Sequence, residues 1–69
     1  MASIASIGET AGKLWSVLDK SGKMTVSSLE KKVKAPAREI AMGIGWLARE
    51  GKIEIREEKR SLYIWLSGR

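Results

Sequence analysis

The sequence predicts an α+β domain in which three helices are followed by a two-stranded β-hairpin. Up to Gly51, apolar residues recur at intervals of three and four, which is the spacing of one buried face of a helix. After Gly51 they recur at intervals of two, as on one face of a strand. The change of period near this glycine therefore separates a helical part of the chain from a hairpin.

The first helix is predicted from about Gly8 to Lys20. The polar stretch DKSGK is expected to end it at Gly22, and residues 1–7 are expected to form an N-terminal lead-in. The apolar residues at helical spacing are Ile7, Ala11, Leu14, Trp15 and Leu18. Trp15 is expected to lie in the core with the others.

The second helix is predicted within MTVSSLEKKVKA. Thr25 can cap it with its hydroxyl while Met24 packs onto Leu29, and Ser27 with Glu30 offers a competing capping box. In either alternative the helix is short, and its apolar face includes Leu29. The three helices are expected to lie within residues 8–50.

The third helix is predicted to begin near Pro36, which suits a first helical turn because the N–H that proline lacks would be unpaired there. Its buried face is predicted from three residues at four- and three-residue spacing: Ile40, Ile44 and Leu47. Gly43 is expected on the core side, where the lack of a side chain would let this helix approach its neighbour closely. Gly51 is expected to end the helix.

The hairpin is predicted over residues 52–67, with strands in KIEI and SLYIWL joined by a polar loop, REEKRS. One face of the hairpin should contain its alternating aliphatic residues: Ile53, Ile55, Leu62, Ile64 and Leu66. Tyr63 and Trp65 alternate with them and are expected on the outer face of the sheet. A short extra strand is expected near Lys23 to Thr25.

Composition excludes several classes of function. The chain has 69 residues, which suits a single domain over residues 1–69, and it contains neither Cys nor His. Disulfides, thiolate or imidazole metal sites, and catalysis by histidine or cysteine are therefore excluded. The glycine spacing matches no phosphate-binding loop. We expect no enzymatic activity, no cofactor and no small-molecule ligand. No apolar run could span a bilayer, and a cytoplasmic protein is expected.

The segment SLEKKVKAPAREIAMGIGWLAREGKIEI resembles the winged helix-turn-helix superfamily. In that superfamily the recognition helix ends in a leucine, a few polar residues, a glycine and an isoleucine that begins the wing; here the matching residues are Leu47, Gly51 and Ile53. GWLAREGKI is especially similar to a family of small uncharacterised prokaryotic winged-helix proteins. The resemblance implies the fold and no specific activity. Glu30 and Lys34 depart from the stricter helix-turn-helix pattern, which has a small residue and a turn glycine at these positions.

The charge favours a polyanionic partner such as duplex DNA, because 13 Lys and Arg stand against 8 Asp and Glu, giving a net charge of +5. Direct readout of bases is expected to be weak, since Ala41, Met42 and Gly45 in the third helix donate no hydrogen bonds. Phosphate contact needs only cations, and the candidates are Lys31, Lys32, Lys34, Arg38, Arg49, Lys59 and Arg60. We expect a small nucleic-acid-binding or transcription-regulator-like module dominated by phosphate contacts.

A simpler interpretation of the same charges stays open at this point. The lysines form a solvated face that keeps the protein soluble, and Glu57 and Glu58 neutralise the hairpin.

The alternative function is protein–protein interaction, with a homodimer or another partner. Exposed Trp and Met beside a helical glycine are typical of interfaces, and the candidate residues are Met42, Gly45, Trp46, Tyr63 and Trp65. An N-terminal segment with Ile4 and Ile7 that folds over Tyr63 and Trp65, or over Trp46, would instead complete the core.

Overall fold

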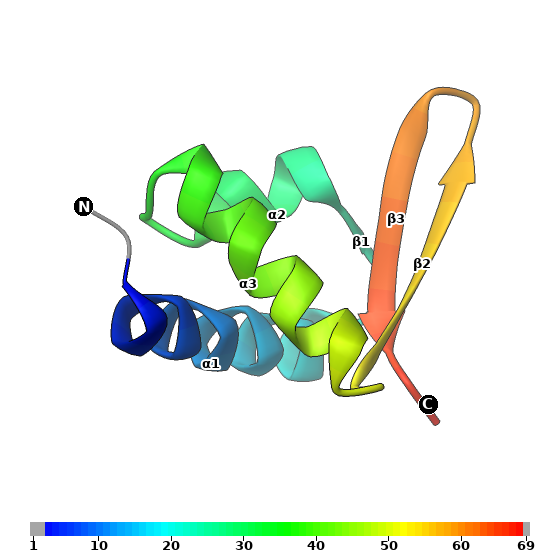
Figure 1. Cartoon of the computed structure of the whole chain (residues 1–69). Coiled ribbons are helices and arrows are strands. Elements are labelled where there is room, and N and C mark those ends of the chain that lie inside the picture. The colour runs from blue at the N-terminus through cyan, green and yellow to red at the C-terminus, as the bar shows by residue number, and fades with distance from the viewer. Residues whose placement is uncertain (1–2, 69) are drawn as a thin grey trace.

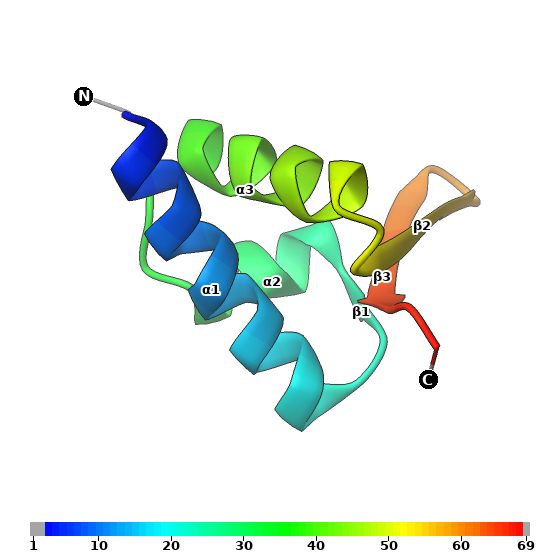
Figure 2. The same cartoon turned by 60° about the horizontal axis from the view of Figure 1, so that its bottom comes forward.

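The computed structural model describes residues 3–68, which form three helices and one three-stranded antiparallel sheet (Figure 1). The elements are α1 (Ile4–Ser21), β1 (Met24–Thr25), α2 (Val26–Lys32), α3 (Ala37–Arg49), β2 (Ile53–Glu58) and β3 (Ser61–Leu66). The strand order is β1-β3-β2. The helices group together and the sheet lies at one side of them (Figure 2). The α+β class, the helix–hairpin order and the short extra strand are confirmed.

Helix α1 begins earlier than the sequence pattern predicts. Its N-cap is Ser3, whose hydroxyl accepts from the Ser6 N–H at 3.1 Å, while the Ser6 hydroxyl accepts from the Ser3 N–H at 2.8 Å. This reciprocal capping box satisfies two backbone donors and starts the helix at Ile4. The expected lead-in is therefore wrong for residues 4–7, and residues 1–2 lie outside the described part of the chain.

Trp15 does not lie in the core, contrary to expectation. The buried apolar side of α1 consists of Ala11, Leu14 and Leu18, whereas Trp15 remains 36% exposed. Position 15 follows Leu14 by about 100° around a helix, so it falls at the edge of the buried arc. The tryptophan covers the side of the core instead of filling its centre.

Helix α2 begins with the predicted cap. The Thr25 hydroxyl accepts from the Ser28 N–H at 3.1 Å, and both Met24 and Leu29 are buried. The competing start at Ser27 is thereby rejected. Pro36 occupies the N-cap of α3, one position before its first turn, and its carbonyl accepts from the N–H groups of Glu39 and Ile40.

Helix α3 packs closely against α1 at Gly43, as predicted. A Cβ built on Gly43 would lie 2.9 Å from Leu14 Cδ1, which leaves no room for a side chain. The helix ends at Arg49, and Gly51, the residue after the C-cap Glu50, has a φ of +71°. Gly51 N–H donates to the carbonyl of Ala48 and Lys52 N–H to that of Leu47, which is a Schellman motif.

The first strand of the hairpin is longer and its turn shorter than predicted, while the bounds of the hairpin agree with the prediction to within one residue. Strands β2 and β3 pair from Ile53 with Leu66 to Glu58 with Ser61, so the turn contains only Lys59 and Arg60. The register places all five predicted aliphatic residues on one face of the sheet. Near the helices that face is buried, but Ile55 and Leu62 are each 44% exposed. They lie nearer the tip, which extends away from the helices in Figure 1.

Candidate nucleic-acid interface

The outer surface of α3 has an arginine near each end and no hydrogen-bonding side chain on the line between them. Arg38, Met42, Gly45 and Arg49 are all exposed. A separation of eleven residues brings Arg49 back to within about 20° of Arg38 around the helix, about 16 Å further along its axis. The two guanidinium groups therefore flank a short line of residues that offers no hydrogen-bond donor.

The hairpin turn presents two further cations in an unusual backbone conformation. Lys59 has φ +48° and Arg60 has φ +73°, and they are the non-glycine residues with positive φ in the described chain. A two-residue hairpin loop with both residues left-handed is a type I′ turn, for which Asn-Gly is strongly preferred. This chain has Lys and Arg at the two central positions of the turn, although neither residue type is favoured there.

The three predicted lysines near the end of α2 lie far from the cations of the hairpin turn. Lys32 and Lys34 line a groove of about 580 Å³ between α1 and α2, together with Lys13. The Lys32 ammonium also donates to the Ser21 hydroxyl at 3.4 Å, and Lys31 is exposed in the last turn of α2. In Figure 1 the end of α2 and the hairpin tip lie on opposite sides of the molecule.

Lys13 is a basic residue that the sequence interpretation did not include. It lies on α1, far from the other lysines in sequence, and only the packing of α1 against the end of α2 brings them together. No local pattern could have identified it.

The ion pairs seen between residues 3 and 68 use none of the seven predicted cations. Lys23 pairs with Glu58 at 3.8 Å and Lys52 pairs with Glu50 at 3.6 Å, and all four side chains are about half exposed. Glu58 is therefore directed to Lys23 on the opposite edge of the sheet and not to the turn cations. Glu58 therefore neutralises the positive charge of Lys59 and Arg60 less than the simpler interpretation of the charges expects.

The candidate protein-interface residues are divided between two faces. Tyr63 and Trp65 lie on the outer face of the sheet, where the Lys23 ammonium sits 4.9 Å and 5.1 Å from their ring centroids. Lys23 thus covers these rings. The alternative in which the N-terminal segment folds over them is wrong, because Ile4 and Ile7 belong to α1, Ile4 is 75% exposed, and the start of α1 lies away from the sheet in Figure 1. Met42 and Gly45 are exposed on a different element, α3.

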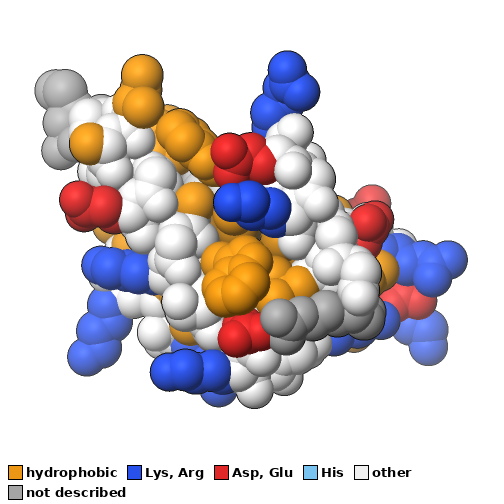
Figure 3. All heavy atoms as spheres, turned by 90° about the horizontal axis from the view of Figure 1, so that it is seen from below, with side chains coloured by type: hydrophobic (Ala, Val, Ile, Leu, Met, Phe, Trp, Pro, Cys, Tyr) orange, Lys and Arg blue, Asp and Glu red, His pale blue; other side chains and the backbone are white. Residues whose placement is uncertain are grey.

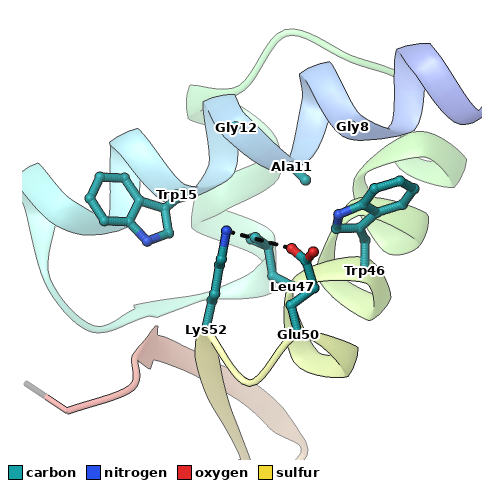
Figure 4. A pocket seen from close by; sticks show the side chains of 8 residues that line it. All are labelled: Gly8, Ala11, Gly12, Trp15, Trp46, Leu47, Glu50 and Lys52. Carbon is teal, nitrogen blue, oxygen red and sulfur yellow. Dashed lines mark ion pairs between the residues drawn. The ribbon is translucent and has the colours of Figure 1, made fainter.

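Trp46 is half-buried against the core, and with Trp15 it forms the walls of a pocket of about 280 Å³ between α1 and α3 (Figure 4). Ala11 and Leu47 lie beneath it, and the ion pair between Glu50 and Lys52 borders it. The space-filling view from below shows hydrophobic side chains gathered at the centre of this side (Figure 3).

Neither a metal site nor a membrane span is found in the described residues. No group of three or more acidic residues there could hold a metal ion, and none of the helices formed by residues 3–68 is long and apolar enough to cross a membrane.

Comparison with known proteins places these features in a family. Residues 1–66 match the family described as a winged helix-turn-helix domain (DUF2582). The uncharacterised protein MJ1608 of Methanocaldococcus jannaschii is 38% identical over 63 residues, which span 87% of this chain and 89% of that protein.

Two solved structures are similar to the whole fold. The solution structure of BT2368 from Bacteroides thetaiotaomicron has a TM-score of 0.83 at 31% identity and covers 93% of this chain and 78% of that one. The Zα domain of PKZ from Carassius auratus, solved in complex with Z-DNA, has a TM-score of 0.75 at 16% identity, over 88% of this chain and 97% of that domain. At so low an identity the second likeness shows the fold alone.

Proposed function

Because this chain belongs to the winged helix-turn-helix domain family DUF2582, we propose that it binds double-stranded nucleic acid through the phosphate backbone with little readout of base sequence. The contacts come from Arg38 and Arg49 on α3 and from Lys59 and Arg60 at the hairpin tip. The lysines that line the groove between α1 and α2 are not part of this set.

The conformation of the hairpin turn is the observation that supports this proposal most. A left-handed backbone costs an L-residue about 1 kcal/mol or more, and both Lys59 and Arg60 adopt it. An Asn-Gly turn would reduce this cost, because glycine has no Cβ and asparagine tolerates the left-handed region. Strain of this kind is characteristic of functional sites, and two cations at an exposed tip suit phosphate binding.

The surface of α3 supports the part of the proposal that concerns base sequence, namely that the protein reads it little. Guanidinium groups bind phosphates in a bidentate geometry, and one stands at each end of the helix. The residues between them provide no donor or acceptor that could distinguish one base pair from another. The helix is therefore suited to hold a duplex and unsuited to select a sequence.

The test is a titration of a labelled duplex of arbitrary sequence, followed by fluorescence anisotropy at low and near-physiological salt. Wild-type affinity should fall steeply with salt because bound cations release counterions. Arg38→Ala should lower the slope of log K against log salt by about 0.9, with equal loss of affinity on A·T-rich and G·C-rich duplexes.

Lys20→Ala is the matched control, since it removes one cation from α1, which packs against the buried side of α3. It should change the affinity much less than Arg38→Ala. Absence of binding at low salt would reject the proposal, and a strong preference for one duplex sequence would reject its second half.

Binding of a second copy of the chain is a separate candidate, favoured by the pocket between Trp15 and Trp46. Sedimentation velocity over a range of protein concentrations tests it. Self-association that Trp15→Ala weakens would support it, and a monomer at every concentration would reject it.

A further inference from the structure

Gly45 lies near the middle of α3, and nothing in the folded chain explains why this residue is glycine. A Cβ built there meets no atom within 4 Å apart from its own helix, so a side chain would project into open space. Its φ is not among the positive values of the chain, and an L-residue would therefore fit the helical backbone without strain. Neither packing nor backbone conformation requires a glycine at this position.

Glycine is nevertheless unfavourable in the interior of a helix. It loses more conformational freedom on folding than any other residue, and only proline is a poorer helix former. Gly43, two residues earlier, is explained by the close approach of α1. Gly45 has no such explanation within the free protein, so its explanation must be sought in a bound partner.

The residues around Gly45 indicate the chemistry of that partner. Arg38 precedes it by about two helical turns and Arg49 follows it by about one, on the same line of the surface. Neither arginine takes part in the ion pairs seen within the described chain. Between the two cations this line of the surface carries only the apolar side chain of Met42 and the bare backbone of Gly45. Such a surface complements an object with negative charge on two sides and a groove between them. A nucleic-acid duplex has this form, with a B-DNA major groove about 12 Å wide between its rows of phosphates.

We propose that Gly45 is the point at which α3 approaches the duplex most closely. The absence of its side chain lets the helix backbone enter the groove while Arg38 and Arg49 bind the phosphates on either side. This inference rests on the proposed function and adds the residue that sets the depth of contact.

The experiment compares Gly45→Ala with Gly12→Ala in the same duplex titration. Gly12 is also an exposed glycine in a helix interior, with no atom within 4 Å of a built Cβ, but it lies on α1. Both substitutions should raise the midpoint of thermal unfolding, because alanine is the better helix former. Loss of binding could then not be attributed to unfolding.

Gly45→Ala should weaken duplex binding about tenfold, as expected where an added group forces a close-packed contact apart. Gly45→Leu should weaken it further, and Gly12→Ala should leave it unchanged. If the wild type binds and Gly45→Ala binds equally well, the inference is overturned while the proposed function stands. If the wild type does not bind, the proposed function itself has failed, and that result is obtained before any variant is made.

Discussion

At the scale of single residues, the two glycines of α3 have opposite surroundings. Gly43 faces α1, where a Cβ would lie 2.9 Å from Leu14 Cδ1 and 3.3 Å from the backbone nitrogen of Ala11. Leu14 has no exposed surface and the Ala11 nitrogen belongs to a helix, so neither atom can move freely. The distance between the two helix axes is therefore set by the absence of one side chain.

Gly43→Ala should destabilise the protein by about 1–3 kcal/mol, which is typical of overpacking. For a domain of this size, each 1 kcal/mol corresponds to a fall of roughly 4–8 °C in the unfolding midpoint. Thermal unfolding followed by circular dichroism measures this midpoint. Gly12→Ala is the control, because a Cβ at this helical glycine meets no other atom within 4 Å. An unchanged midpoint for Gly43→Ala would mean that α1 and α3 can separate without cost.

The hairpin turn allows stability and binding to be changed in opposite directions. Replacing Lys59 by Asn and Arg60 by Gly relieves two left-handed residues, so the double variant should be more stable by about 1–2 kcal/mol. Its duplex affinity should fall, because two cations are lost.

Lys59→Ala with Arg60→Ala is the control for that double variant. It removes the same charges and keeps the strain, so it should lose affinity equally without gaining stability. Chemical denaturation and the duplex titration together separate the two effects. Retention of full affinity by both double variants would show that the turn cations do not touch the duplex.

At the scale of elements, α2 depends on its cap more than the longer helices do. It has seven residues and one fully buried side chain, Leu29, and isolated helices of that length are unstable in water. The Thr25 hydroxyl satisfies the Ser28 N–H, while Thr25 also pairs with Tyr63 in the sheet. One residue therefore joins the second helix to the third strand of the sheet.

Thr25→Ala should lower the free energy of unfolding by about 1 kcal/mol, the usual effect of removing a threonine cap. Thr25→Ser should retain most of the stabilisation by the cap, because the hydroxyl remains. Ser27→Ala, at the rejected cap position, should be neutral. Urea denaturation measures all three, and an equal loss from Thr25→Ala and Ser27→Ala would contradict the observed start of α2.

At the scale of the whole molecule, every helix and the sheet contribute to one core. Fully buried side chains come from four elements, namely Leu14 from α1, Leu29 from α2, Ile40 from α3 and Ile64 from β3. No element can leave this core without exposing the others. The molecule measures 32 × 23 × 20 Å across its Cα atoms, which leaves room for a single core only.

Unfolding should accordingly be one cooperative transition, as the expectation of a single domain requires. The three tryptophans lie in α1, α3 and β3, so their fluorescence reports on all parts of the core, while far-ultraviolet circular dichroism reports on the helices. The two transitions should coincide in urea. Separate midpoints would mean that the hairpin and the helices unfold independently.

Local pattern was sufficient for most of the fold because each element begins and ends with its own chemistry. Thr25 and Gly51 act through hydrogen bonds to residues nearby in the chain, and the change of period after Gly51 needs no partner to be recognised. The start of α1 was missed because a serine pair, Ser3 with Ser6, replaces the usual serine–glutamate capping box. The turn contains fewer residues than predicted because Lys59 and Arg60 are not typical turn residues, so the sequence did not mark them as a two-residue turn.

The sequence by itself determined the order of the elements, the cap of α2 at Thr25, the stop after α3 at Gly51 and the net positive charge, since these depend on neighbours along the chain and on composition. Only the tertiary structure decided that Trp15 remains partly exposed, that Lys23 covers Tyr63 and Trp65, and that Lys13 joins Lys32 and Lys34. Each of these depends on contacts between segments that are distant in the chain. Such contacts follow from the packing of whole elements, which no local pattern contains.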